Sequence, residues 1–283
     1  MCEMPVSKTQ IDRLGDRLKE GLHTESDLRL LDDYRRSFGE AYEAVIRTIR
    51  RVGEFPTGRL AKSTLSIVEK LRRESIRLSQ MQDIAGCRVV VANVVQQERF
   101  LESLKTVFPA ASVIDRRDNP SYGYRAVHVI AEISGKPIEI QVRSALQHLW
   151  AELSEKSSDV LDPTIKYGGG PDEWRTFLLK SSKAVASHEK VEKTHFKLVA
   201  AIVLATATEE KFKKTLAKLL DHHPSDQTIQ KIRGDLEDST RRVECLERDR
   251  EKLRGELVQM WNEVADLLQS EIFKLDDLKR KKQ

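Results

Sequence analysis

Two acidic side chains, Asp83 and Glu139, stand where a magnesium-dependent site could form. Asp83 comes just before the apolar run Cys-Arg-Val-Val-Val, and Glu139 lies in a segment that alternates apolar and polar residues. Both patterns are typical of β-strands. Carboxylates that converge from neighbouring strands can hold Mg²⁺, which prefers hard oxygen ligands and keeps phosphate oxygens in its shell. An alternative, that both acids form salt bridges with Arg88 and Arg143, stays open.

A second group of polar residues, Lys62, Ser66 and Lys70, is spaced at intervals of four. On a helix over residues 63–75 these side chains share one face. Two ammonium groups and a hydroxyl could bind a polyphosphate, although a solvated helix face has the same pattern. No GxxxxGK[ST] phosphate loop occurs, and the triple glycine at 168–170 lacks a strand-turn-helix context, so we interpret it as a linker.

Aromatic and guanidinium groups are the remaining candidates for nucleotide binding. Tyr124 follows a glycine and could stack on a nucleobase, or it could be a packing residue at the start of a strand. His128 could bind a phosphate or hydroxyl group, or be structural. Arg59 and Arg88 could lie flat against a purine, because guanidinium planes stack on aromatic faces.

The elements that would position these residues are a mixed sheet and helices. We expect a helix over 8–52, a helix over 63–75, a strand over 86–92, a helix over 95–107, strands over 112–116, 126–133 and 137–143, and a helix over 147–156. Gly135-Lys136 suits the turn of a hairpin between the last two strands. This order predicts an α/β (α+β) domain, with a mixed sheet flanked by helices.

The C-terminal part of the sequence is predicted to be helical. Residues 167–171 form the clearest linker, and apolar residues over 225–278 recur close to every 3.5 positions. We expect a coiled-coil-like helix that folds back in cis or pairs in trans, giving a homo-oligomer. The predicted organisation is an N-terminal helical segment at 1–55, a catalytic domain at 56–166 and a helical extension at 167–283.

Composition limits the function classes. The chain has 283 residues, 33% of them charged, and a net charge of +4, which is too balanced to indicate a nucleic-acid binder from bulk charge. Its three cysteines have no CxxC spacing, so we expect neither zinc nor disulfides but a reducing, cytoplasmic location. We also expect no secretory signal and no membrane span.

Together these segments resemble the synthetase domain of the RelA/SpoT family of alarmone synthetases, over roughly residues 40–160. Four blocks match in order: Lys62…Ser66…Lys70-Leu71, Gln82-Asp83-Ile-Ala-Gly-Cys-Arg88, Gly123-Tyr124-Arg125…His128 and Glu139-Ile-Gln141-Val-Arg143. The resemblance implies a nucleotidyltransferase-like fold. It also implies a GTP/GDP diphosphokinase that moves the β,γ-diphosphate of ATP to the 3′-hydroxyl of GDP or GTP, making (p)ppGpp and AMP.

The resemblance also implies roles for individual residues. Asp83 would be the main Mg²⁺ ligand and Glu139 a second acid that assists the metal or the attacking hydroxyl. The ATP ligands would be Lys62, Ser66, Lys70, Arg88 and Arg59. The acceptor ligands would be Tyr124, which stacks on the guanine, together with His128, Gln141, Arg143, Arg116 and Arg117.

Two departures from the family pattern bear on the substrates. The family usually has an arginine two residues before the first lysine, where this chain has Leu60, with Arg59 one residue earlier. The loop before Gly123 lacks the family's usual lysines, and Arg116 and Arg117 lie further back. An alternative acceptor is therefore the 3′ end of tRNA, or an adenosine nucleotide. A third hypothesis is an interaction protein whose helical tail carries the function on an inactive enzyme domain.

The chain contains no His-Asp dipeptide, and only 61 residues precede Lys62. The family's hydrolase domain comes before its synthetase domain, so we expect no alarmone hydrolysis and a stand-alone small synthetase.

Overall fold

The computed structural model describes residues 7–220 and 225–282. The chain divides into two compact units, one made of residues 1–92 and 96–148 and the other of residues 93–95 and 149–283. No helix within the described ranges is long and apolar enough to cross a membrane.

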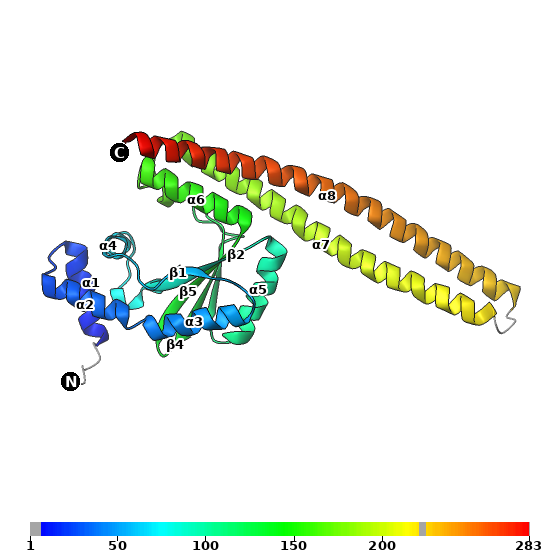
Figure 1. Ribbon diagram of the computed structural model, residues 1–283, viewed down its shortest axis with the longest axis horizontal. Helices are drawn as coiled ribbons and strands as arrows, with labels where there is room; N and C mark the ends of the chain where they lie inside the picture. Colours follow the sequence, from blue (N-terminus) through cyan, green and yellow to red (C-terminus); the bar gives the residue numbers. More distant parts are fainter. Residues whose placement is uncertain (1–6, 221–224, 283) are drawn as a thin grey trace. The chain divides into compact units, whose positions relative to one another are not determined.

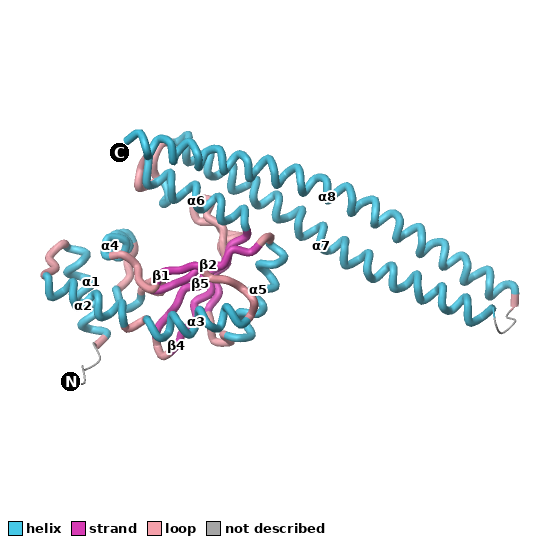
Figure 2. The backbone as a smooth tube through the Cα atoms, in the orientation of Figure 1, coloured by secondary structure: helices cyan, strands magenta, loops and turns pink. Residues whose placement is uncertain are grey.

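A five-stranded mixed sheet forms the centre of the first unit (Figure 2). Its strands are β1 (Thr57–Arg59), β2 (Ala85–Val91), β3 (Ser112–Asp115), β4 (Val127–Ile133) and β5 (Lys136–Ser144), in the order β1-β2-β5-β4-β3. Strands β2 and β5 are parallel, and the other neighbours are antiparallel. The predicted fold class is confirmed. Strand β1, which has only three residues, was not predicted.

The helices of this unit are α1 (Lys8–Glu20), α2 (Glu25–Arg36), α3 (Gly39–Arg51), α4 (Thr64–Arg73) and most of α5 (Val94–Val107). The prediction of one helix over residues 8–52 is wrong. Gly21, with φ 76°, ends α1 in the left-handed conformation that glycine adopts without strain. Thr24 then starts α2 through a capping box with Asp27. These local caps override the apolar periodicity that continues across them.

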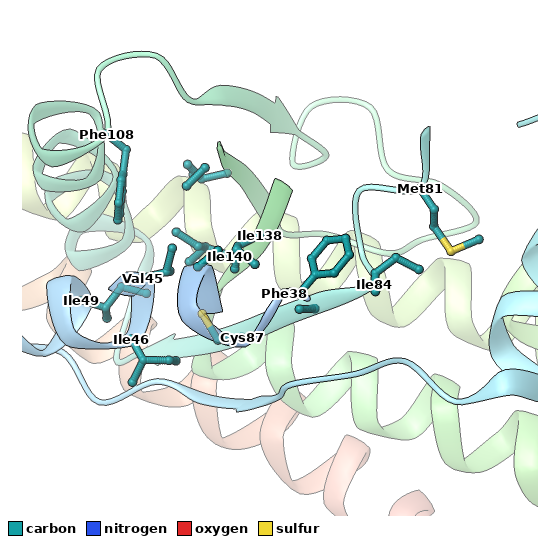
Figure 3. Packing of buried hydrophobic residues seen from close by; sticks show 14 of the residues in the cluster. Phe38, Val45, Ile46, Ile49, Met81, Ile84, Cys87, Phe108, Ile138 and Ile140 are labelled. Carbon is teal, nitrogen blue, oxygen red and sulfur yellow. The ribbon is translucent and has the colours of Figure 1, made fainter. Parts of the chain in front are cut away.

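Helix α3 covers one face of the sheet, where it packs against β2, β4 and β5. Its buried Val45 and Ile49 belong to the same apolar cluster as Cys87, Ile138 and Ile140 (Figure 3). Side chains alternate between the two faces of a strand, so the polar residues of β4 and β5 project from the face opposite α3. The core therefore fixes which side of the sheet can carry a polar site.

Two close approaches in the sheet depend on glycine. A Cβ on Gly86 would lie 2.8 Å from the backbone oxygen of Glu139, and a Cβ on Gly58 would lie 2.8 Å from the Cβ of Cys87.

The hairpin between β4 and β5 turns at Ser134 and Gly135, with φ angles of 52° and 73°, one residue earlier than predicted. These contacts hold β1, β2, β5 and β4 in register.

The second unit is helical. It comprises most of α6 (Ala145–Val160), with α7 (Asp172–Leu220) and α8 (Asp226–Lys282), which run antiparallel side by side (Figure 1). His188 of α7 makes an edge-to-face contact with Trp261 of α8, with ring centroids 5.7 Å apart. Of the two predicted arrangements, the structure shows the tail folded back in cis. Homo-oligomer formation through these helices stays a prediction.

Candidate active site

Asp83 and two lysines form the most tightly paired part of the site. Lys62 Nζ lies 2.5 Å from Asp83 Oδ2, and Lys70 Nζ lies 2.9 Å from Asp83 Oδ1. Lys62 is placed by its backbone amide, which donates to the carbonyl of Ile84, and Lys70 by one of the last turns of α4. The loop before α4 and the last turn of α4 thus bring both ammonium groups to one carboxylate.

Ser66, the middle residue of that spacing, has a different partner. The Ser63 hydroxyl caps the N-terminus of α4 by accepting from the Ser66 amide, and it donates to the Ser66 hydroxyl at 2.8 Å. The Ser66 side chain is therefore part of the cap of α4 in this structure.

The charge state of Asp83 follows from its surroundings. Burial raises the pKa of this carboxyl, but the charges and hydrogen bonds of Lys62 and Lys70 outweigh that effect, so the pKa lies below its ordinary value. Asp83 is therefore ionised at neutral pH. An ionised carboxylate with two adjacent ammonium groups can exchange these partners for a divalent cation and for phosphate oxygens.

Glu139 lies on β5 in a closed ring of hydrogen bonds with four other residues. Its two oxygens contact His128 Nδ1 at 2.8 Å and the Gln141 amide nitrogen at 2.8 Å. Arg143 Nη2 donates to the Gln141 side-chain oxygen and to the Tyr124 hydroxyl, both at 3.0 Å. The Tyr124 hydroxyl closes the ring at 3.0 Å from His128 Nε2. The structure thus brings together five of the predicted site residues.

The ring assigns a proton arrangement to its members. An ionised carboxylate only accepts, so His128 Nδ1 must donate to Glu139. In the neutral imidazole Nε2 is then an acceptor, and the Tyr124 hydroxyl donates to it while it accepts from Arg143. In this arrangement each hydrogen bond of the ring has one donor and one acceptor.

Glu139 interacts with both the ring and Asp83. Burial raises the pKa of Glu139, the hydrogen bonds from His128 and from the Gln141 amide lower it, and the charge of Asp83 raises it; the net direction is downward. The two carboxylates are thus near enough to interact electrostatically, and both are ionised at neutral pH.

The donor set around these acids fits one Mg²⁺ that takes its remaining ligands from phosphate and water. Among the described residues no group of three or more His, Cys, Asp or Glu side chains could hold a metal ion alone. A cage made only of protein ligands is therefore not available in the described part of the chain. Two repelling carboxylates beside two lysines provide part of a site, which a bound polyphosphate could complete.

A tight turn presents Tyr124. The Tyr124 amide donates to the Ser121 carbonyl at 2.9 Å, and Tyr122 and Gly123 between them have φ angles of 53° and 94°. Positive φ values at both central positions are those of a type I′ turn. The Tyr124 ring is half-buried, and burial raises the pKa of its hydroxyl. The anchored hydroxyl fixes the direction of the ring.

The two predicted adenine ligands come from adjacent strands. Arg88 on β2 is paired in register with Gln141 on β5, which is itself paired with His128 on β4. These three residues therefore lie in one row on the polar face. Arg59 ends β1, opposite Gly86.

The structure separates the two arginines of the loop before Tyr124. Arg117 is 8% exposed, and its guanidinium donates to Asp115, to Glu98 at 2.8 Å and to Gln97 at 3.3 Å. Arg116 donates to the Ser121 hydroxyl at 2.6 Å, at the start of the turn that carries Tyr124. The structure therefore brings Arg116 to this turn and places Arg117 in a buried ion cluster.

A pocket of about 360 Å³ adjoins Lys62 and was not predicted from the sequence. It is lined by Asp32, Arg35 and Arg36 of α2 and by the residues 60–63. Arg35 donates to Asp32 at 2.7 Å and to the Thr64 hydroxyl at 2.8 Å, which ties α2 to the first turn of α4. No sequence spacing relates residues 32–36 to residues 60–63, so only the folded chain shows this grouping.

Part of the chain is similar to known proteins. Residues 58–158 match the family model described as a region found in RelA/SpoT proteins. Proteins of Mycobacterium bovis and Mycobacterium tuberculosis, each named only as uncharacterized, are 30% identical over 177 residues, or 60% of this chain. The aligned segment spans 65% of the length of these curated relatives.

Among solved structures, a crystal structure of small alarmone synthetase 1 from Bacillus subtilis is similar to part of this chain. The two sequences are 28% identical, and the match covers 62% of this chain and 97% of that chain, with a TM-score of 0.42.

Proposed function

We propose that the protein is a pyrophosphokinase, because residues 58–158 match the family model of a region found in RelA/SpoT proteins. It transfers the β,γ-diphosphate of ATP to the 3′-hydroxyl of GDP or GTP, releases AMP and makes (p)ppGpp. The observation that carries the proposal is the Asp83 carboxylate between Lys62 and Lys70, beside the ring that holds Glu139 and Tyr124. Acids, cations and an aromatic ring are the groups that this transfer requires.

The donor side of the proposed site is cationic. Lys62 and Lys70 leave Asp83 to donate to phosphate oxygens of ATP, and Ser66, Arg59 and Arg88 are the other expected ATP ligands. Asp83 and Glu139 would hold the Mg²⁺. When bound, this ion offsets the negative charge that develops on the transferred group. Phosphoryl transfer depends mainly on positioning and charge neutralisation, which these residues provide.

The acceptor side is the ring around Glu139. Tyr124 offers a fixed aromatic face to the guanine, and Gln141, Arg143 and His128 hold that face in place. Ionised Glu139 accepts a hydrogen bond from the attacking 3′-hydroxyl. Its lowered pKa makes it a weak base, so its role is to orient the hydroxyl rather than to remove the proton early.

A product assay tests this proposal. The purified protein is mixed with Mg²⁺, ATP labelled in the γ-phosphate, and either GDP or GTP. We expect AMP and labelled 3′-pyrophosphorylated guanosine in equal amounts. Release of inorganic phosphate without AMP, or no product with either acceptor, would reject the proposal.

One observation favours a second acceptor, the 3′ end of tRNA. Arg117, one of the two loop arginines expected to hold the acceptor's 5′-phosphates, is bound to Asp115 and Glu98. An acceptor without a free 5′-polyphosphate needs fewer cations there. Transfer of label from γ-labelled ATP to tRNA, with none to GDP or GTP, would establish this alternative. The reverse result would eliminate it.

A further inference from the structure

The pocket between α2 and the N-terminal end of α4 has walls of mixed chemistry. Arg35 and Arg36 provide two guanidinium groups, Leu60 and Ala61 provide apolar surface, and Asp32 provides a carboxylate. Its volume of about 360 Å³ is near the lower end of the range of roughly 300–1,000 Å³ that is usual for small-molecule sites. A pocket of this size suits a nucleoside better than a whole nucleoside triphosphate.

The same pocket shares one residue, Lys62, with the candidate active site. Lys62 lines the pocket, and its Nζ is the atom that contacts Asp83. A ligand with phosphates near Lys62 can therefore extend its other end toward α2. In the α2 wall, the Asp32 carboxylate offsets the charge of Arg35 and can accept hydrogen bonds from hydroxyl or amino groups.

From these contacts we propose that α2 forms one wall of the donor-nucleotide site, and that Arg35 and Arg36 bind the base and ribose end of ATP. This inference rests on the proposed function, since it assigns the occupant of the same site. Planar guanidinium groups stack on a purine, and Leu60, which is 42% exposed, adds apolar contact area.

The two arginines differ in how they are held. The side chain of Arg35 is 12% exposed and is fixed by Asp32 and Thr64, so its removal would also weaken the link between α2 and α4. The side chain of Arg36 is 75% exposed and pairs with Asp33 at 3.3 Å. Arg36 can therefore be replaced without loss of the fold, which makes it the residue to test.

A matched control lies on the same helix. Arg29 is 77% exposed and pairs with Glu25, one turn before it, but it does not line the pocket. We compare Arg36→Gln with Arg29→Gln by titration calorimetry, with three ligands: the α,β-methylene analogue of ATP, AMP and inorganic tripolyphosphate. The analogue cannot react, because the bond that would break is replaced.

We expect Arg36→Gln to weaken binding of the analogue and of AMP by about 3- to 10-fold, the range of a modest cation–π contact. Its affinity for tripolyphosphate should change less than twofold, and Arg29→Gln should match the wild type with all three ligands. In steady-state assays Arg36→Gln should raise the KM for ATP and leave the KM for the acceptor unchanged.

Each other outcome contradicts the inference in a distinct way. Equal AMP affinities for Arg36→Gln and Arg29→Gln, in a protein that binds the analogue, would overturn the α2 wall and leave the proposed function intact. If Arg36→Gln weakens the binding of tripolyphosphate as much as the binding of AMP, the pocket binds phosphates rather than the base and ribose, which contradicts the inference. A wild-type protein that binds neither the analogue nor AMP would overturn this inference and the proposed function together.

Discussion

Lys70 Nζ lies 2.9 Å from Oδ1 of Asp83, although the two residues are separated by the end of α4 and the loop before β2. Lys62 Nζ donates a hydrogen bond to the other carboxylate oxygen, Oδ2. The carboxylate is thus paired with both lysines, and the three side chains together carry one net positive charge. Phosphates that draw the lysines away leave Asp83 free to bind a cation, so donor and metal binding are expected to be coupled.

Asp83→Asn is predicted to abolish transfer. The amide cannot supply the charge that holds a divalent cation, and we expect kcat to fall by more than about 100-fold, as for loss of one electrostatic element of a transition state. AMP release is the measurement. Glu132→Gln, which alters an exposed carboxylate of β4, should retain wild-type activity. Full activity of Asp83→Asn would remove Asp83 from the reaction.

Tyr124→Phe and Tyr124→Ala should separate stacking from anchoring. Loss of the ring costs on the order of 1–3 kcal/mol of stacking, so Tyr124→Ala should raise the acceptor KM by roughly 5- to 150-fold. Tyr124→Phe keeps the ring and should raise the KM by less than about 5-fold, while the unpaired Arg143 and His128 groups lower stability by about 1–3 kcal/mol. Equal KM values for the two variants would contradict the stacking role.

The two loop arginines should behave differently. Arg117→Met removes the partner of Asp115 and Glu98, and we expect the free energy of unfolding to fall by about 1–3 kcal/mol with little change in the acceptor KM. Arg116→Met should leave stability nearly unchanged and raise the acceptor KM. Denaturant unfolding and initial rates measure the two effects. A stable Arg117→Met protein with a raised KM would restore Arg117 to the acceptor site.

Glu192 of α7 gives a pH dependence of stability in the second unit. Burial raises the pKa of its carboxyl from 4.5 to about 7. The Glu192 carboxylate accepts a hydrogen bond from the Val94 amide at 3.1 Å, which lowers this pKa, and the charge of Glu189 raises it further. The folded state binds this proton more tightly than the unfolded state. The contribution is therefore fully present below about pH 4.5 and is lost as the pH rises through about 7.

Glu192→Gln keeps an oxygen for the Val94 amide and cannot ionise. Its Tm should exceed that of the wild type at pH 8, and the difference should shrink toward pH 5. Thermal unfolding at several pH values measures this, with the exposed Glu210→Gln on the same helix as control. A Tm difference that does not vary with pH would show that Glu192 does not titrate as described.

Much of the fold could be predicted because its signals are local. The alternation of β5 and the apolar repeat of α8 each depend on residues near in sequence, and both elements formed where expected. The break into α1, α2 and α3 was missed because the caps at Gly21 and Thr24 interrupt an otherwise continuous apolar period. The four-residue spacing indicated that Lys62 and Lys70 belong together, but Lys62 precedes α4, and neither its backbone bond to Ile84 nor the shared partner Asp83 has a local sequence signal.

The remaining features of the site depend on contacts between distant segments. Arg117 is buried because Glu98 and Gln97 of α5 reach it, and no local pattern relates those helix residues to the loop. The pocket formed by residues 32–36 and 60–63 likewise requires α2 to pack beside the start of α4. The glycine before Tyr124 indicated the turn, but the positive φ of Tyr122 had no sequence signal.

The most direct test of the central claim measures whether the labelled β,γ-diphosphate of ATP is transferred to the acceptor. The protein, Mg²⁺, labelled ATP and GDP are incubated, and AMP and labelled guanosine product are quantified for the wild type and for Asp83→Asn. We predict stoichiometric AMP and 3′-pyrophosphorylated guanosine from the wild type and neither product from the variant. Wild-type protein that forms no pyrophosphorylated product with GDP, GTP or tRNA, while it remains folded and binds ATP, would contradict the account.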